Sequence, residues 1–208
     1  IAGPSEILVV ADAHNDPAWI AADLMSQAEH DAVAQAVLIC DSTEFADAVV
    51  AAVDHLLEQL PRADIARQSW EDFGAIIIID DVMTPAAALV NTLAPEHLEL
   101  AVEDPEALAK DIRHAGAIFL GRYTPEAIGD YIAGPNHVLP TARAARYASG
   151  LSVLDFMKRS SLVRCDAASL AKIGPDALLL AEEDGLHAHG RSIAIRLNQR
   201  PPGARDDG

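Results

Sequence analysis

The sequence predicts an α/β protein with a Rossmann-like parallel sheet and flanking helices, followed by a small, mostly helical C-terminal lobe. Two observations predict this class. Short apolar, β-branched runs alternate with helical patterns through the first two thirds of the chain. The alternation stops after Thr141. We therefore expect an α/β domain over residues 1–141, a lobe over residues 142–198 and a disordered tail over residues 199–208, which are rich in proline, glycine and charge.

Five apolar runs have the length of strands and are expected to form the sheet. They lie at residues 7–11, 36–40, 75–79, 98–101 and 117–120. The densest run, residues 75–79, is far shorter than the roughly eighteen apolar residues that indicate a membrane span. We therefore expect a soluble, cytoplasmic protein that does not bind membranes.

Most of the expected helices begin with a capping side chain followed by proline, which the first turn of a helix tolerates. Asp16-Pro17 begins a helix to about residue 29, and Ser42 or Thr43 caps the next one, to about residue 60. In the lobe, residues 167–182 form the clearest helical pattern, and residues 192–197 alternate apolar and polar. Three further helix starts repeat the cap-proline device, at Thr84-Pro85, Asp104-Pro105 and Thr124-Pro125.

The composition excludes some partners and cofactor motifs. The chain has 15 basic and 32 acidic residues and a net charge of −17, so it lacks the basic surface that nucleic-acid binding requires. No two glycines are separated by a single residue, so a G-x-G-x-x-G dinucleotide loop is absent, and we assign no cofactor-binding residues in this chain. Cys40 and Cys165 lack the spacing of a zinc site, and we expect two buried, reduced thiols.

Short polar clusters in the otherwise apolar sequence suggest metal and acid/base chemistry. Gln27 and His30 are three residues apart and share one helix face, where an amide oxygen and an imidazole nitrogen can bind one cation. Asp130 and His189 would complete a mixed nitrogen and oxygen set suited to zinc. An i,i+3 polar pair is more often a solvated helix face.

Glu96 and His97 are adjacent and could act as general bases beside the metal. A Pro-Glu pair in a loop often only caps backbone amides, and this alternative stays open.

Five segments in one order resemble the histidinol dehydrogenase family. They are AGPSE (residues 2–6), LMSQAEH (24–30), NTLAPEHLEL (91–100), AGPNHVLPT (133–141) and SGLSVLDF (149–156). The resemblance covers residues 1 to about 198, and several collinear motifs are far more specific than any one of them. Members of the family are roughly twice this length. The resemblance therefore implies the C-terminal half of the family's chain, with an incomplete dehydrogenase domain.

The resemblance implies oxidation of L-histidinol through L-histidinal to L-histidine, the last step of histidine biosynthesis, with zinc and NAD as cofactors. It implies Gln27, His30, Asp130 and His189 as zinc ligands that also contact substrate. His189 rather than its neighbour His187 matches the family's C-terminal motif. The family's NAD contacts lie mainly outside the matched part.

Further roles also follow from the resemblance alone. Glu96 and His97 match the proton-handling pair, and His97 also contacts substrate. Ser5, His137 and Asp184 match substrate-contacting positions, although the family usually has Glu where Asp184 stands. Because family members are homodimers with shared sites, we expect a homodimer in which His189 acts across the interface.

Two other functions remain open at this point. In a metal-dependent hydrolase, Glu96 or His97 would activate a zinc-bound water. In an inactive binding or assembly module, the chain would keep the metal ligands while lacking the NAD pocket. The second alternative is compatible with our expectation that this chain alone does not oxidise histidinol.

Overall fold

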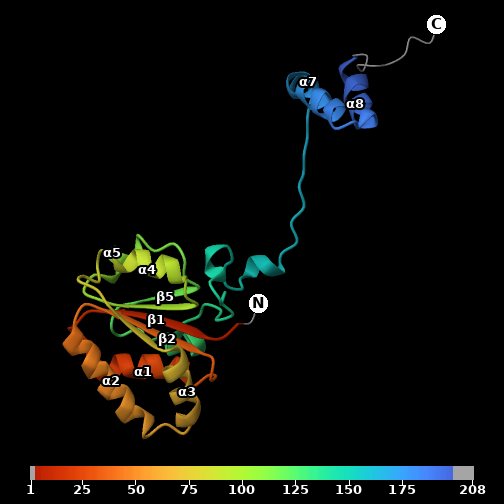
Figure 1. Cartoon of the computed structure of the whole chain (residues 1–208). Helices are drawn as coiled ribbons and strands as arrows, with labels where there is room; N and C mark the ends of the chain where they lie inside the picture. The colour runs from red at the N-terminus through yellow and green to blue at the C-terminus, as the bar shows by residue number, and fades with distance from the viewer. Residues whose placement is uncertain (1–2, 199–208) are drawn as a thin grey trace. The chain divides into compact units, whose positions relative to one another are not determined.

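The computed structural model describes residues 3–198, which fall into two compact units that divide between Phe156 and Met157. The first unit is the expected α/β fold (Figure 1). The tail predicted at residues 199–208 lies outside the described residues.

The first unit is built on five parallel strands in the order β3-β2-β1-β4-β5. The expected apolar runs form all five, within one residue at each end. The strands are β1 (Glu6–Ala11), β2 (Gln35–Cys40), β3 (Ala75–Ile78), β4 (His97–Ala101) and β5 (Ala117–Leu120). The three central strands are almost wholly buried because helices cover both faces of the sheet.

Two apolar clusters lie on opposite faces of this sheet. One packs alternate residues of β1, such as Ile7 and Val9, against α1 (Pro17–Ala28), α2 (Thr43–Leu57) and α3 (Ala63–Phe73). The other packs Leu8 and Leu98 against the region of α4 (Ala86–Leu93) and α5 (Pro105–Ala109). A short helix, α6 (Glu126–Tyr131), contacts both β4 and α1. The sheet therefore separates two helical layers (Figure 1).

The predicted caps separate into two groups. Asp16, Ser42 and Asp104 each accept a hydrogen bond from the first turn of the following helix, as expected. Thr124 instead donates its hydroxyl hydrogen to the Leu120 carbonyl, and α6 begins without a local side-chain cap. The start of α4 also lacks a side-chain cap.

Residues 142–156 belong to the first unit, so its boundary lies later than the change in sequence pattern after Thr141. They contain the 3-10 turns η1 (Ala144–Arg146) and η2 (Val153–Phe156). The Ala142 amide donates to the Glu6 carboxylate, and the Leu151 amide donates to the Val138 carbonyl. The first bond attaches this segment to β1 and the second joins it to the loop before it, although its sequence has no strand or helix periodicity.

The second unit contains α7 (Ala167–Glu183), α8 (His187–Ala194) and the 3-10 turn η3 (Ile195–Leu197). The residues 192–197, which alternate apolar and polar, are therefore helical. The spacing of four between Ile193 and Leu197 fits one helical turn as well as the strand period of two.

Cys40 is buried, but Cys165 is exposed, so the prediction for Cys165 is wrong. It lies in an irregular segment before α7, where no layer covers it. Among the described residues, no helix is long and apolar enough to cross a membrane.

Candidate metal and acid/base site

The candidate site lies at the amino ends of the parallel strands. His97 begins β4 and pairs in register with Ile7 of β1 and Ala117 of β5. Helices that connect parallel strands run in the opposite direction, so α1 ends at this edge, with Gln27 in its last turn. The C-terminal end of a helix carries partial negative charge, which favours a cation there.

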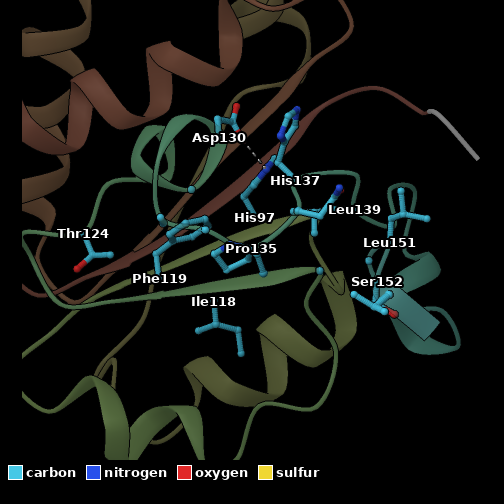
Figure 2. A pocket seen from close by; sticks show the side chains of 18 of the residues that line it. His97, Ile118, Phe119, Thr124, Asp130, Pro135, His137, Leu139, Leu151 and Ser152 are labelled. Carbon is cyan, nitrogen blue, oxygen red and sulfur yellow. Dashed lines mark ion pairs between the residues drawn. The ribbon is translucent and has the colours of Figure 1, made fainter. Parts of the chain in front are cut away.

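The His97 ring is buried, and its hydrogen bonding fixes its tautomer. Its Nδ1 lies 3.0 Å from the Glu6 carbonyl oxygen, which can only accept, so Nδ1 carries the hydrogen. The other nitrogen, Nε2, is then a free acceptor, and it has no hydrogen-bond partner. Nε2 lies 3.6 Å from Glu126 Oε1 and 4.0 Å from Asp130 Oδ1 (Figure 2 shows His97 and Asp130).

His97, Glu126 and Asp130 form the metal-binding candidate found among the described residues, with one ligand atom of each within 4.8 Å of the others. Glu126 is only 2% exposed, and its Oε1 also lacks a hydrogen-bond partner. Burial, followed by the neighbouring Asp130 carboxylate, raises the pKa of Glu126 to about 7. The cluster thus concentrates acceptor atoms that lack donors, which a cation or a proton can supply.

Glu96 has the amide-capping contact that the sequence left open as an alternative. Its Oε2 accepts the Glu6 amide hydrogen at 3.0 Å and lies 3.5 Å from His97 Nδ1. Burial raises the pKa of Glu96, and the nearby His97 opposes that rise. A buried carboxyl next to a buried imidazole is suited to proton transfer as well as to holding β1 against β4.

Gln27 and His30 approach the cluster from the end of α1. Gln27 is 1% exposed and its Oε1 has no hydrogen-bond partner, so it is not part of a solvated helix face. His30 is exposed, and its Nδ1 donates to the Ser26 carbonyl at 2.9 Å, which leaves Nε2 as a free acceptor. Ser26 Oγ lies 3.4 Å from Glu126 Oε2, and His30 lowers the pKa of Glu126. The α1 terminus therefore adjoins the acidic cluster.

A cavity of about 860 Å³ adjoins the cluster, and its lining includes His97, Asp130 and the predicted substrate residue His137. In Figure 2, Phe119 and Pro135 line the same space. Ser5 lies just before β1 at the same edge, where its carbonyl accepts the Gln35 amide hydrogen.

The remaining predicted site residues lie in the second unit. Asp184 is the C-cap of α7, and His189 lies in α8. Near them Nδ1 of His187 lies within hydrogen-bond distance of the Glu182 carboxylate, at 2.9 Å. Their part in the site stays a prediction.

Glu126 was not among the residues predicted from the sequence, and neither were Glu99 of β4 and Asp23 of α1, whose buried carboxyl groups interact with each other. Glu126 lies four residues before Asp130, one turn along the same helix, and this spacing was a usable signal. Glu99 follows His97 at the strand period of two, which places both on one sheet face. Asp23 had no such signal, because only the packing of α1 brings it to Glu99.

Comparison with known proteins identifies the family. A profile described as histidinol dehydrogenase matches residues 1–197. A histidinol dehydrogenase of Rhodospirillum rubrum is 66% identical over 199 residues, which cover 96% of this chain and 46% of the relative. The histidinol dehydrogenase of Rhizobium meliloti is 60% identical over a region that covers 95% of this chain and 45% of that relative. The crystal structure of histidinol dehydrogenase from Elizabethkingia anophelis superposes with a TM-score of 0.88 at 39% identity, over 95% of this chain and 45% of that one. The chain spans about half the length of the curated relatives it matches, and it belongs to the histidinol dehydrogenase family.

Proposed function

We propose that this chain carries the metal-binding and proton-handling part of a histidinol dehydrogenase, which oxidises L-histidinol through L-histidinal to L-histidine in histidine biosynthesis. The observation that carries the proposal is the convergence of His97, Glu126 and Asp130 at the end of α1, with acceptor atoms that lack partners. We also propose a cytoplasmic location, as expected for a biosynthetic enzyme.

Zinc is the proposed metal, held by Gln27, His30, Asp130 and His189. Two features support this fit: the buried, unpaired Gln27 Oε1, and the free Nε2 of His30 beside the acidic cluster. When bound, the ion supplies a fixed positive charge that holds the imidazole and amine of the substrate. Glu126 adjoins these ligands and tunes the charge of the site.

His97 is proposed as the general base. Oxidation of an alcohol and then of an aldehyde hydrate requires proton removal from two hydroxyl groups. The Nε2 of His97 is held as an acceptor by the Glu6 carbonyl behind it and faces the cavity-side carboxylates. Glu96 is proposed to activate the water that forms the hydrate, and Ser5, His137 and Asp184 to contact substrate.

NAD is the proposed hydride acceptor, and we assign none of its contacts to residues of this chain. The sequence lacks a glycine-rich dinucleotide loop. At the carboxyl ends of the strands, where open α/β sheets often bind such ligands, Arg122 and Asp12 form an ion pair at 2.6 Å. NAD contacts are therefore expected mainly from the part of the family chain that this sequence does not match.

A zinc titration and a turnover assay test this function. Calorimetric titration of the metal-free chain with zinc is expected to give one site, and His30→Ala to weaken it at least tenfold. The exposed His55, which pairs only with neighbouring helix residues, provides a matched His55→Ala control that should bind zinc normally. Absence of zinc binding by the unaltered chain would contradict the proposal.

Turnover separates the enzyme from the inactive-module alternative. We expect no NADH from the purified chain with zinc, histidinol and NAD, but rapid NADH formation by the full-length Rhodospirillum rubrum relative under the same conditions. NADH formation by the chain itself would show that it contains a nicotinamide pocket. Hydrolase activity without NAD would favour the metal-dependent hydrolase instead.

A homodimer with shared sites is the proposed assembly. Mixing a His30→Ala chain with a His189→Ala chain tests it. If the site is shared, each mixed dimer has one site with both lesions and one with neither, so zinc binding partly recovers. No recovery, with subunit exchange verified by mass, would place His189 in the site of its own subunit.

A further inference from the structure

The start of α6 has an unusual cap. Its N-cap residue is Pro125, which has no side-chain acceptor, yet the next amide, of Glu126, is buried. An unpaired buried amide costs free energy, so such groups are nearly always hydrogen bonded. The acceptor here is Glu99 Oε1, 2.5 Å from the Glu126 nitrogen and 27 residues away in sequence.

Glu99 is an acidic residue in an apolar layer. It lies on β4 between Val9 of β1 and Phe119 of β5, is 3% exposed, and points to the face that α1 and α6 cover. Its carboxyl lies within hydrogen-bonding reach of Asp23 on α1. Burial of such a group is unfavourable unless it is well paired, so an apolar residue would suit the sheet itself better. Glu99 is needed instead because α6 requires an acceptor for its first amide hydrogen.

The same helix carries two residues of the site. Glu126 is its first residue and Asp130 its fifth, and both face His97 Nε2. A second close contact holds the helix farther along, because a Cβ at Gly129 would lie 2.5 Å from the Phe119 ring. The Glu99 bond and the Gly129 contact therefore fix the two ends of α6 on neighbouring strands.

We propose that Glu99 is a positioning residue for the metal and acid/base site: it caps α6 from the sheet and so sets the distances of Glu126 and Asp130 from His97. The proposal rests on the proposed metal site for its functional meaning. A cap must reach the amide and accept its hydrogen. The capping side chain need not be charged. A neutral acceptor of the same length therefore distinguishes a positioning role of Glu99 from an electrostatic one.

Two substitutions separate reach from charge. Glu99→Gln keeps the length and the acceptor oxygen, and its amide group can donate to Asp23. Glu99→Asp keeps the carboxyl group but is one methylene shorter. Glu99→Leu removes the acceptor, and Leu100→Val on the opposite face of β4 is a matched core control.

The first measurement is amide hydrogen exchange of α6 by NMR in the metal-free chain. We expect Glu99→Gln to leave exchange at Glu126 and Ala127 within about threefold of the unaltered chain. Glu99→Asp and Glu99→Leu should accelerate it at least tenfold relative to the central strands, whereas Leu100→Val should not. This measurement needs no metal, so it tests the positioning even if the metal site fails.

The second measurement is zinc affinity by calorimetry. We expect Glu99→Gln to bind within about threefold of the unaltered chain, and Glu99→Asp at least tenfold more weakly. If Glu99→Leu does not fold, the Gln and Asp variants decide alone. Weak zinc binding by Glu99→Gln with normal α6 exchange, or normal behaviour of Glu99→Asp in both measurements, would overturn the proposal. Failure of the unaltered chain to bind zinc would contradict the proposed function instead.

Discussion

The two edges of the same sheet differ in whether their buried carboxylates are paired with a cationic side chain. At the carboxyl edge, Arg122 binds both oxygens of Asp12 at 2.6 and 2.8 Å, and the Asn15 side-chain amide donates to Asp12 and to the Ala101 carbonyl. At the amino edge, the carboxylates of Glu126 and Asp130 lie together beside His97, and no Lys or Arg among residues 3–198 forms an ion pair with either of them.

The pKa values show the difference. The Asp12 carboxylate raises the pKa of Arg122, so the guanidinium stays charged beside it. At the other edge, burial raises the pKa of Glu126 to about 7. The paired edge is organised for stability. The unpaired edge holds acceptors that a cation or proton must complete, and this identifies the site more clearly than the usual location rule for α/β sheets.

The largest expected effect is the loss of zinc binding at the amino edge. Asp130→Asn should weaken zinc binding about a hundredfold, ~3 kcal/mol, because an amide oxygen is a much poorer ligand than a carboxylate. The variant should fold at least as stably without metal, since repulsion between Asp130 and Glu126 is removed. Calorimetry and urea unfolding measure the two effects. Lower stability together with normal zinc affinity would mean that Asp130 stabilises the fold and does not bind zinc.

The second effect is pH dependence. Because the Glu126 pKa is raised from 4.5 to about 7, the folded chain keeps a proton that the unfolded chain releases, so stability is full below pH 4.5 and falls as pH rises to about 7. Glu126→Gln should therefore gain about 2–3 kcal/mol relative to the unaltered chain between pH 4 and pH 8. Urea unfolding in metal-free buffer measures this gain. Parallel pH profiles of the two proteins would contradict it.

The third effect concerns the carboxyl edge. Asp12→Asn leaves Arg122 without its counter-charge and should lower the free energy of unfolding by about 2 kcal/mol, with unchanged zinc affinity. Glu103 also lies 3.6 Å from Arg122, but its side chain is 86% exposed. Glu103→Gln is therefore the matched control and should change stability by less than about 0.5 kcal/mol. A zinc defect in Asp12→Asn would mean that the two edges are coupled.

The smallest effect is a displacement of α6. Gly129→Ala places a methyl group against Phe119 and should weaken zinc binding about fivefold, ~1 kcal/mol, by moving Asp130. Adding Phe119→Leu to make room should restore part of the affinity. Calorimetry of the single and double variants measures this, and an additive loss in the double variant would argue against a steric cause.

Local sequence patterns predicted the sheet well because each strand is a short apolar run between polar turns. The caps at Asp16, Ser42 and Asp104 were also predictable, since each acts within three residues. The histidinol dehydrogenase family could be inferred from the collinear motifs. The resemblance also selected His97 and Asp130, which the structure brings together. These features depend on neighbours along the chain.

Other features depend on contacts that sequence periodicity does not encode. Gln27 reads as a surface residue but is buried, because α6 packs against the end of α1. Residues 142–156 join the first unit through contacts with residues far away in sequence, such as the hydrogen bond from the Ala142 amide to the Glu6 carboxylate. Cys165 is exposed because no element covers its segment.

The sequence by itself determined the α/β class, the strand positions, the local caps and the family. Only the tertiary structure placed the candidate site at the amino edge, brought Glu126 next to His97 and Asp130, and showed that Glu99 accepts the first amide hydrogen of α6 from a position 27 residues away. The physical reason is the distance along the chain over which each interaction acts. Propensity and capping act over a few residues, whereas the pairing of a buried carboxylate depends on which amide the packed helices bring to it.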